Sequence, residues 1–446
     1  MPERTLKKVS LQTVGCRLNQ YETERMAAEL NRFGFQRVKR GEPADLYIIN
    51  TCTVTHRADA DDRYWIHRAA RENPNARIVV AGCYVDADQE AIEDMEEVDV
   101  VITNEEKERI AEILPRRLPD LFADLHDSGC ANDGARFEHF NRAWVKVSDG
   151  CNQRCSFCIL PSVRGGLVNR PVGEIIHEVT ELVNSGFQEI VLTGLHLGMY
   201  RHHVVGDSVP DLASLIRIIL AETTIKRVRL SSIEPQTVTP QLLEVFAEAG
   251  PRLCRHLHIP LQSGSGKILR LMRRPYEPET YVRTLHMVRE IQPHIVIGAD
   301  VIVGFPGETD EDFRETKHLV QSGLLDYLHV FSYSERRNTP AANLPDKVQS
   351  AVIKSRNGIL AKISDGLRAE CFQRQVGHVL GVIAEHKKAD RGVFWGIADN
   401  YTKVKLPLEF EGGRQIVPFK VTGACDDHVV GEILNDFTNG HASRIA

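Results

Sequence analysis

The stretch VSDGCNQRCSFC, residues 147–158, carries Cys151, Cys155 and Cys158 within eight positions. Three thiolates on one loop can hold three irons of a four-iron cluster and leave the fourth iron without a protein ligand. The open iron would then bind a small chelating molecule or a sulfur atom. A zinc knuckle completed by a histidine is the alternative, but no histidine follows at a usual spacing. The spacing therefore favours an iron–sulfur cluster with one open iron.

Strand-like apolar runs alternate with helical segments on both sides of this loop and beyond it. One helical segment is PVGEIIHEVTELVNSG, residues 171–186. Six strand–helix repeats are too few for a closed eight-strand barrel, so they predict an open, partial (βα)6 barrel of the TIM type over residues 142–370. The predicted strands are 144–150, 189–197, 227–233, 257–264, 295–305 and 327–334.

Residues 1–115 repeat the alternation of strand and helix. Their apolar runs are rich in valine and isoleucine, which is typical of buried parallel strands. The first helix is predicted to begin at Asn19, because asparagine often caps helices. The pattern predicts an amino-terminal parallel α/β sheet domain, followed by a linker over 116–141 where the pattern is lost. The predicted strands are 9–14, 45–54, 76–83 and 98–103.

A second set of thiols lies in the amino-terminal domain. Cys16, Cys52 and Cys83 each follow directly on a predicted strand. The carboxyl ends of parallel strands meet at one edge of a sheet, where α/β proteins bind ligands, so the three thiols are expected to converge. Gly15 and Gly82 would allow a close approach of the backbone to a bulky group there. The alternatives are buried cysteines that only fill the core, or a structural zinc site.

The last part of the chain, residues 371–440, consists of short β-like runs separated by glycines and charged residues. Such a pattern predicts a small all-β barrel. The expected fold class is therefore α/β, with a parallel α/β sheet domain, a central partial barrel and a carboxy-terminal β barrel.

Composition limits the class of protein. The chain has 446 residues, of which 42% are hydrophobic and 26% charged, as in soluble globular proteins. The start of the chain resembles no secretory signal, and no apolar run approaches the roughly 20 residues that span a bilayer. We therefore expect a cytoplasmic protein, in which ten cysteines indicate metal or redox chemistry rather than disulfides. The net charge of −6 excludes a broadly basic coat, so any nucleic acid would be bound by local basic residues.

Several motifs of the chain resemble those of a known family. The whole of residues 8–436 is similar to the radical S-adenosylmethionine methylthiotransferases, and most similar to the branch that acts on N6-threonylcarbamoyladenosine in tRNA. The motifs that carry the resemblance are TVGCRLNQYETE (13–24), NTCTVTHRAD (50–59), VAGCY (80–84), VSDGCNQRCSFCILP (147–161), RLSSIEP (229–235), PLQSGS (260–265) and DVIVGFPGET (300–309).

The resemblance implies two 4Fe-4S clusters and S-adenosylmethionine as cofactors. Cys151, Cys155 and Cys158 would hold the cluster whose open iron binds S-adenosylmethionine. The auxiliary cluster, which would carry the sulfur, would be held by Cys16, Cys52 and Cys83. By their positions in the family's motifs, the residues expected to contact S-adenosylmethionine are Phe157 at the adenine, Ser232 and Gln262 at the ribose or carboxylate, and Gly304 through its backbone.

The resemblance also implies an activity and partners. The enzyme would install a methylthio group at C2 of threonylcarbamoyladenosine next to the tRNA anticodon. Its partners would be tRNA, an electron donor such as flavodoxin or ferredoxin, and a source of sulfur, with no membrane. The carboxy-terminal barrel resembles the TRAM module that binds RNA, although a solvated charged surface is the alternative reading of its basic residues. The residues expected to contact phosphates are Lys387, Lys388, Arg391, Lys403 and Lys405.

Two other functions remain open at this point. One is the same chemistry on isopentenyladenosine or on an aspartate of a ribosomal protein. The other is a non-catalytic iron–sulfur or zinc protein that binds RNA. Substrate chemistry separates the tRNA alternatives, because a threonylcarbamoyl group carries a carboxylate and needs a cation or several donors, whereas a prenyl group needs an apolar wall.

Overall fold

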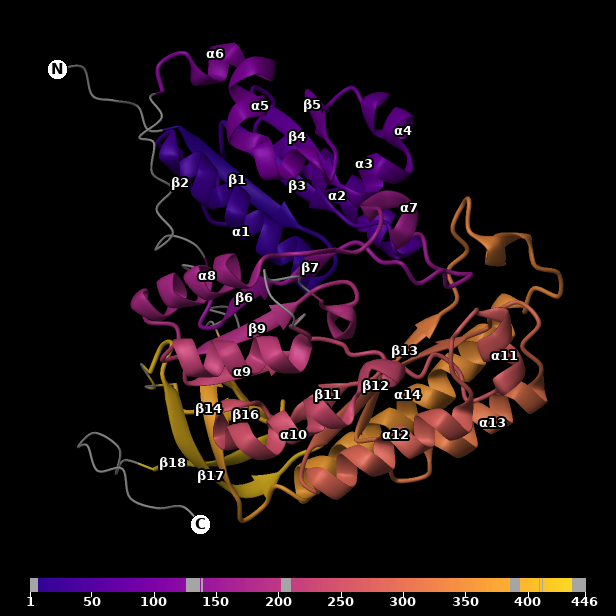
Figure 1. Ribbon diagram of the computed structural model, residues 1–446. Helices are drawn as coiled ribbons and strands as arrows, with labels where there is room; N and C mark the ends of the chain where they lie inside the picture. Colours follow the sequence, from indigo (N-terminus) through magenta and orange to yellow (C-terminus); the bar gives the residue numbers. More distant parts are fainter. Residues whose placement is uncertain are drawn as a thin grey trace.

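The computed structural model describes residues 7–125, 137, 139–201, 210–385, 394–408, 410 and 412–434. Figure 1 shows a parallel sheet at the amino-terminal end, a central barrel of strands wrapped by helices, and a small β barrel at the carboxy-terminal end. These are the three parts that the sequence predicts. No helix within the described ranges has the length and apolar character needed to cross a membrane.

The amino-terminal sheet is parallel throughout, with strand order β2-β1-β3-β4-β5. Apolar side chains of α1 and α5 pack on one face of the sheet, and those of α2 pack on the other. The predicted parallel α/β domain is thus confirmed. Its elements are β1 (Lys8–Thr13), α1 (Arg17–Arg32), β2 (Gln36–Arg37), β3 (Leu46–Thr51), α2 (His56–Glu72), β4 (Arg77–Gly82), α3 (Cys83–Ala87), α4 (Gln89–Glu93), β5 (Val100–Ile102), α5 (Ile110–Arg117) and α6 (Pro119–Phe122).

Two local predictions differ from the structure. Helix α1 begins at Arg17, with Cys16 at the N-cap position, so Asn19 is not its cap. The Asn19 amide instead donates to the carbonyl oxygens of Val14 and Thr51, both at 2.8 Å, and so ties the end of β1 to the end of β3. Helix α6 lies inside the stretch predicted as a linker, because Leu121 and Phe122 pack on the core of the sheet.

The central part is an open barrel of six parallel strands, as predicted. Strands β10-β9-β6 and β11-β12-β13 form two three-stranded sheets, which one bridge between Val228 and Leu253 joins. The edge strands β6 and β13 do not pair within the described part of the chain, so the barrel stays open. The strands are β6 (Ala143–Lys146), β9 (Glu189–Thr193), β10 (Arg227–Leu230), β11 (His256–His258), β12 (Val296–Val303) and β13 (Tyr327–Ser332).

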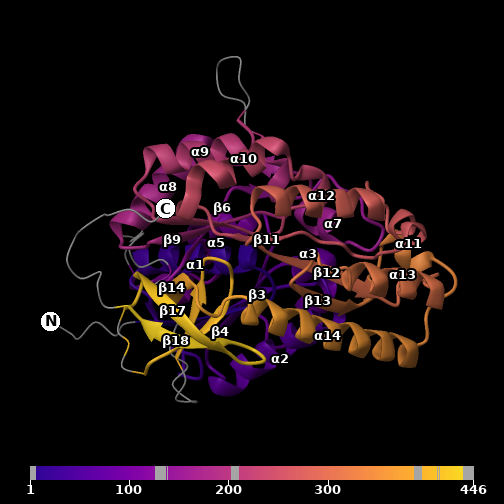
Figure 2. The same ribbon diagram turned by 90° about the horizontal axis from the view of Figure 1, so that it is seen from below.

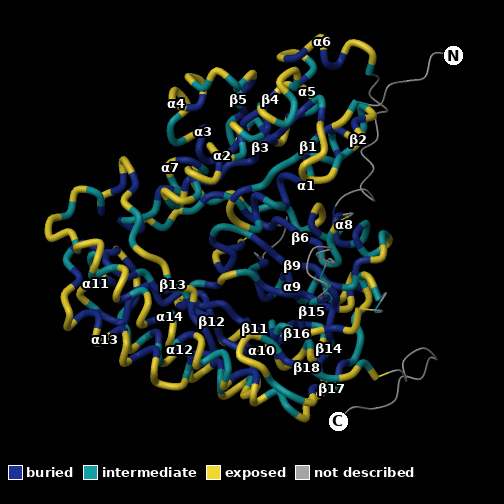
Figure 3. The backbone as a smooth tube through the Cα atoms, turned by 180° about the vertical axis from the view of Figure 1, so that it is seen from behind, coloured by how far each residue is buried: buried dark blue, intermediate teal, exposed yellow. Residues whose placement is uncertain are grey.

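Helices cover the outside of the barrel and share its core. Figure 3 shows the buried strands behind helices whose outer surfaces are exposed. The helices are α8 (Val172–Asn184), α9 (Leu212–Glu222), α10 (Pro240–Ala249), α11 (Gly266–Leu271), α12 (Pro278–Ile291), α13 (Asp310–Val320) and α14 (Ser350–Gln373). The short hairpin of β7 (Ser148–Asp149) with β8 (Val168–Asn169) and the helix α7 (Leu160–Arg164) flank the loop of Cys151, Cys155 and Cys158.

The carboxy-terminal part is a closed five-stranded barrel, which confirms the predicted all-β barrel. Figure 2 shows it beneath the strands of the central barrel. Buried charged side chains join the central barrel to the carboxy-terminal barrel. Arg229 donates to the carbonyl oxygens of Ala398 and Asp399, and Glu189 pairs with Arg229 at 2.8 Å. The strands of the carboxy-terminal barrel are β14 (Val379–Ala384), β15 (Phe394–Ala398), β16 (Lys403–Leu406), β17 (Ile416–Ala424) and β18 (Val429–Ile433).

Candidate active site

Three neighbouring strands of the amino-terminal sheet each end in a cysteine. Cys16 follows the end of β1 at the N-cap of α1, Cys52 follows β3, and Cys83 is the first residue of α3 after β4. Since β1, β3 and β4 lie side by side, the fold brings all three to one edge of the sheet, as expected. Cys16 is exposed there, whereas Cys52 and Cys83 are buried. We call these residues the strand-end trio.

The turns of the strand-end trio are tightly packed. Gly15 has φ +100°, and a Cβ atom on it would lie 2.5 Å from the Cβ and 2.7 Å from the Sγ of Cys52. Gly82 has φ +106°, and its Cβ would lie 2.9 Å from Oδ1 of Asn50. Both turns require glycine for conformation and for space.

The thiols of the strand-end trio influence one another electrostatically. Burial, with smaller contributions from the neighbouring Cys16 and Cys83, raises the pKa of the Cys52 thiol to about 12, although a backbone hydrogen bond acts in the opposite direction. Two groups donate hydrogen bonds to the sulfur of Cys83, since Arg164 Nε lies 3.2 Å and Asn104 Nδ2 3.5 Å from Sγ. Iron ligands are thiolates, so these contacts suit a cluster ligand.

Cys151, Cys155 and Cys158 lie on one loop, between β7 and α7, and we call them the loop trio. The Cys158 amide donates to the Cys155 carbonyl at 3.2 Å, and the Cys151 amide donates to the Gly165 carbonyl at 3.1 Å. Burial raises the pKa of the Cys158 thiol to about 12, with smaller contributions from the other two thiols. The loop therefore holds three thiols within electrostatic reach of one another, as a shared cluster requires.

A buried arginine also contacts the loop trio. Arg274 Nη1 donates to Cys155 Sγ at 3.2 Å, and the same guanidinium pairs with Glu234. His196 Nδ1 lies 3.8 Å from Cys151 Sγ, and its buried Nε2 has no hydrogen-bond partner among the described residues. Burial and the charge of Arg274 lower the pKa of His196, so this imidazole is neutral. An unpartnered polar nitrogen beside three thiols suits a site that also binds a polar molecule.

The segment that follows the loop trio packs against the strand-end trio. Cys83 shares an apolar cluster with Ile159 and Val163, which follow the loop trio in sequence. Arg164, in the same helix α7, pairs with Glu22 at 2.5 Å on helix α1. Figure 1 shows α7 beside α3 at the boundary between the sheet and the barrel.

An electrostatic network supports this boundary. Burial alone would raise the pKa of Glu22, but Lys107 and Arg164 hold it well below its usual range. Lys107 lies 2.7 Å from Glu22, and both side chains are buried. A second buried pair, Arg336 with Asp59 at 2.6 Å, joins the barrel to helix α2 near Cys52.

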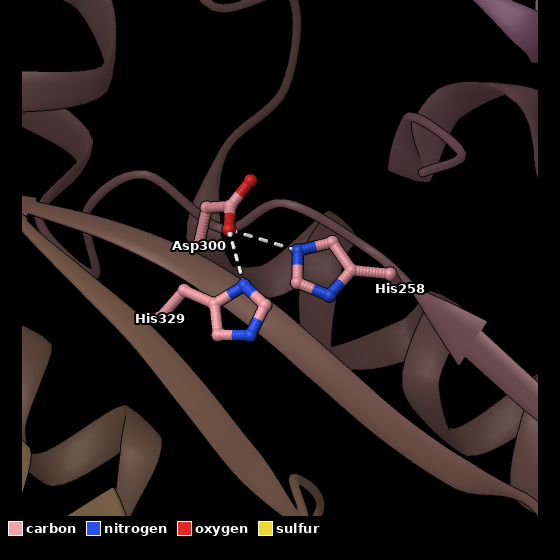
Figure 4. Close-up of side chains that lie close together, drawn as sticks. All are labelled: His258, Asp300 and His329. Atoms are coloured by element: carbon pink, nitrogen blue, oxygen red, sulfur yellow. Dashed lines mark ion pairs between the residues drawn. The ribbon is translucent and has the colours of Figure 1, made fainter. Parts of the chain in front are cut away.

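The barrel carries a further polar cluster on β11, β12 and β13. His258 Nε2 and His329 Nδ1 both contact Oδ1 of Asp300, at 2.9 and 3.4 Å (Figure 4). Ala299 and Val301 belong to the apolar core, so by alternation Asp300 faces the interior of the barrel. Burial would raise the pKa of Asp300, but its hydrogen bonds to the two imidazoles hold it well below its usual range.

The residues predicted to contact S-adenosylmethionine have different surroundings. Phe157 is half-buried against a small apolar cluster that includes Phe305, and Ser232 is exposed. Gln262 has φ +64° and bridges to Val301 of β12. Gly304 has φ +77°, and a Cβ there would lie 2.3 Å from Ile353 of α14, so packing within the protein already accounts for this glycine. Their roles at a cofactor stay predictions.

The basic residues predicted for RNA divide into two groups. Lys387, Lys388 and Arg391 lie outside the described residues. On β16, Lys403 Nζ lies 3.1 Å from Asp427 and 3.8 Å from the centre of the Trp395 ring. Lys405 is exposed on the same strand, opposite Trp395 in the register. Two of the five cations thus lie on one strand beside an aromatic ring.

Comparison with known proteins identifies the family. Residues 145–320 match the model of the Radical SAM superfamily, and residues 8–103 match that of Uncharacterized protein family UPF0004. The threonylcarbamoyladenosine tRNA methylthiotransferase MtaB of Bacillus subtilis is 36% identical over 96% of each chain. The protein of the same name from Aquifex aeolicus is 33% identical, over 92% of this chain and 99% of its own.

The chain belongs to the radical S-adenosylmethionine tRNA methylthiotransferases. This confirms the resemblance seen in the sequence and makes the protein an enzyme, so the non-catalytic alternative is set aside. Membership of the methylthiotransferases implies a 4Fe-4S cluster, S-adenosylmethionine and a tRNA substrate.

Other relatives show the breadth of the methylthiotransferases. The tRNA-2-methylthio-N(6)-dimethylallyladenosine synthase of Mycolicibacterium smegmatis is 34% identical, over 96% of this chain and 87% of its own. Among solved structures, the radical S-adenosylmethionine methyltransferase TsrM of Kitasatospora setae has a TM-score of 0.56 at 14% identity, over 86% of this chain and 79% of its own. That likeness concerns the fold alone.

Sequence reasoning missed several residues of the site. Arg164, Arg274 and His196 contact thiols, and Glu22, which also pairs with Lys107, holds Arg164 in place. Of the three residues that contact thiols, only Arg164 lies close in sequence to a cysteine motif, and its contact is with the other trio. No spacing rule would have found these contacts.

Proposed function

We propose that this enzyme installs a methylthio group at C2 of N6-threonylcarbamoyladenosine next to the anticodon of tRNA. The observation that carries the proposal is that helix α7, which directly follows the loop trio, packs against Cys83 of the strand-end trio at the boundary of sheet and barrel. The names of the Bacillus subtilis and Aquifex aeolicus relatives support threonylcarbamoyladenosine as the substrate.

The loop trio would hold the cluster that binds S-adenosylmethionine. When bound, the cluster and S-adenosylmethionine supply a carbon radical that removes the hydrogen from C2 of the adenine. Arg274 orients Cys155 through its N–H group and is itself held by Glu234. The buried Nε2 of His196, which has no partner among the described residues, would be available to a polar group of the bound molecule.

The strand-end trio would hold an auxiliary cluster that carries the sulfur. Arg164 and Asn104 donate hydrogen bonds to the sulfur of Cys83, and the turn at Gly15 lies against Cys52. Because Cys16 is exposed, this cluster would face the substrate on the side of Cys16.

The remaining assignments complete the proposal. Lys403 and Lys405 of the carboxy-terminal barrel would contact tRNA phosphates, with Trp395 available for stacking on a base. A flavodoxin or ferredoxin would supply electrons, and a separate source would supply sulfur. The enzyme would act in the cytoplasm, with domains over residues 1–115, 142–370 and 371–440 around a 116–141 connection.

Nucleoside mass spectrometry of tRNA from cells with and without the gene tests the proposal. Loss of the gene should remove the methylthio form of threonylcarbamoyladenosine and leave the unmethylthiolated nucleoside in its place. Restoring the gene should restore the product, and the Cys155→Ala gene should not. Unchanged methylthio-threonylcarbamoyladenosine in the deletion strain would overturn the proposal.

A second candidate substrate is dimethylallyladenosine. Four actinobacterial relatives named for that substrate are 34–35% identical to this chain, close to the 33–36% of the relatives named for threonylcarbamoyladenosine. The same measurement separates the two, since this alternative predicts loss of the methylthio form of dimethylallyladenosine.

A further inference from the structure

Arg17 is a partly buried cation without a carboxylate partner. It is the first residue of α1 and directly follows Cys16 of the strand-end trio. Its Nη2 donates to the hydroxyl of Tyr401 at 2.9 Å, and the guanidinium carbon lies 5.7 Å from the centre of that ring. Within the described ranges no carboxylate lies at ion-pair distance from Arg17. Its charge is therefore available to an anion from outside the protein.

Other arginines between the parts of the molecule are paired. Arg164 pairs with Glu22, Arg336 with Asp59, and Arg142 with Glu385. The pairing offsets the loss of hydration that a partly buried charge suffers. Arg17 differs from these three because its polar partner, among the residues that the structure describes, is a neutral hydroxyl. Its positive charge can therefore still pair with an anionic ligand.

Tyr401 holds Arg17 in a defined position. Its ring stacks on His256 of β11 with centroids 4.6 Å apart, and His256 lies 2.8 Å from the hydroxyl of Tyr327. The guanidinium is thus placed by three parts of the chain, namely α1, the central barrel and the carboxy-terminal barrel. A preorganised donor binds its ligand with a smaller loss of conformational entropy.

Arg17 lines a cavity of about 250 Å³ at this junction. Its walls include guanidinium and amide donors, an indole ring and the carboxylate of Glu385, which is paired with Arg142 at 2.7 Å. Besides Arg17, the lining residues include Gln20, Asn141, Arg142, Trp144, Glu385 and Tyr401. Such walls suit a polar, anionic group better than a prenyl chain, which needs apolar surroundings.

The place of Arg17 in the chain fits the geometry of the proposed substrate. In adenine, C2 and C6 both flank N1, so a group on N6 lies toward the same edge as C2. Under the proposed function, sulfur would reach C2 from the strand-end trio, and Arg17 is the residue next to Cys16. A guanidinium also matches a carboxylate in geometry and charge, with two parallel N–H donors.

We propose that Arg17 binds the carboxylate of the threonylcarbamoyl group and so selects this nucleotide over dimethylallyladenosine. This inference rests on the proposed function. A phosphate of the RNA is the other source of an anion that could reach the same guanidinium, and the experiment separates the two.

The test measures binding of three anticodon stem-loops to the enzyme reconstituted with iron and sulfide. The first RNA carries threonylcarbamoyladenosine, the second its neutral carboxamide analogue, and the third dimethylallyladenosine. Because Arg17→Gln removes a charge-assisted hydrogen bond, we expect it to lower the affinity of the enzyme for the first RNA by about 10- to 100-fold. The other two RNAs should bind Arg17→Gln as they bind the parent. Arg17→Lys should recover part of the loss.

Arg368→Gln is the matched control. Arg368 is also partly buried, and none of the described carboxylates forms an ion pair with it. It lies over an aromatic ring, 5.4 Å from the centre of Tyr327, but it lines the neighbouring cavity and not that of Arg17. Any loss that it causes should be equal for the three RNAs. Iron content and the cluster absorbance of Arg17→Gln must equal those of the parent, because Arg17 adjoins Cys16.

Equal weakening of all three RNAs by Arg17→Gln would overturn the inference in favour of a phosphate contact, and no weakening would overturn it outright. These results are distinct from failure of the proposed function. If the parent enzyme methylthiolates threonylcarbamoyladenosine but Arg17→Gln keeps the preference, only the inference about Arg17 falls. If the parent never modifies that nucleotide, the proposed function falls.

Discussion

The loop trio and the strand-end trio reach a similar arrangement of three thiols by different routes. Cys151, Cys155 and Cys158 lie within eight consecutive positions, and hydrogen bonds to Gly165, Met272 and Arg274 add to those within the loop. The strand-end trio is spread from Cys16 to Cys83 and depends on β1, β3 and β4 being neighbours. The first trio is thus brought together within one short loop, whereas the second is brought together only by the folded sheet. Their dependence on the rest of the protein should differ accordingly.

The largest expected effect separates the chemistry of the two trios. Cys155→Ala should reduce the formation of 5′-deoxyadenosine to background, because the open cluster loses one of its three ligands. Cys52→Ala should leave that formation intact but stop the transfer of sulfur to tRNA. Both are measured by chromatography of nucleosides in anaerobic assays. Normal sulfur transfer by Cys52→Ala would contradict the assigned roles.

The next effect concerns the buried arginine that joins the trios. Arg164→Met leaves Glu22 with one cation fewer and removes a donor from Cys83, so the free energy of unfolding should fall by about 3–5 kcal/mol. Denaturant unfolding measures this change. The matched control is Arg217→Met, whose partly exposed pair with Glu248 should contribute only about 0–1 kcal/mol. Equal losses of unfolding free energy in the two variants would show that the buried pair of Arg164 stabilises the fold no more than an exposed pair does.

A pair of glycine variants tests the packing of the strand-end trio. Gly15→Ala and Gly165→Ala both force alanine into a positive-φ conformation, with strain of about 1–3 kcal/mol. Only Gly15→Ala adds a clash with Cys52, which should contribute about 1–3 kcal/mol more, since nothing lies within 4 Å of a Cβ at Gly165. Iron analysis after anaerobic reconstitution should find about four irons fewer per chain in Gly15→Ala alone. Loss of iron from both variants would show that the clash with Cys52, which only Gly15→Ala introduces, is not the cause.

The smallest expected effect comes from a buried histidine of the central barrel. Burial lowers the pKa of His256 well below its usual value, and the charge of Arg229 adds to this. The unfolded chain takes up a proton below about pH 6.5 while the folded chain does not, so stability is lost as the pH falls below that value, by at most about 1.4 kcal/mol per pH unit. Denaturant unfolding at several pH values measures the slope.

His256→Gln should flatten this slope, whereas the exposed His286→Gln should leave it as in the parent. Iron retained by the strand-end trio should decline with the stability of the fold, and iron retained by the loop trio should decline less. A parallel decline of both would remove the distinction between the local and the assembled trio.

Much of the fold follows from local patterns in the sequence. Valine-rich runs predict the parallel strands of the amino-terminal sheet and the six strands of the open barrel, because buried parallel strands are apolar along their length. The exceptions are local. Asparagine is a common helix cap, yet the side-chain amide of Asn19 donates instead to the carbonyl oxygens of Val14 and Thr51. The stretch after Pro115 lacks a clear period, yet Leu121 and Phe122 pack on the sheet and stabilise a short helix.

The sequence by itself determined the ligand sets: thiols at fixed spacing on one loop, and thiols directly after three strands that the alternation of strand and helix makes parallel. Only the tertiary structure decided which charged groups accompany them. Arg164 contacts Cys83 across 81 positions, and Arg17 contacts Tyr401 across 384. The physical reason is that spacing in a chain encodes contacts within a turn or along a strand, whereas the partner of a buried charge is set by which surfaces the fold brings together.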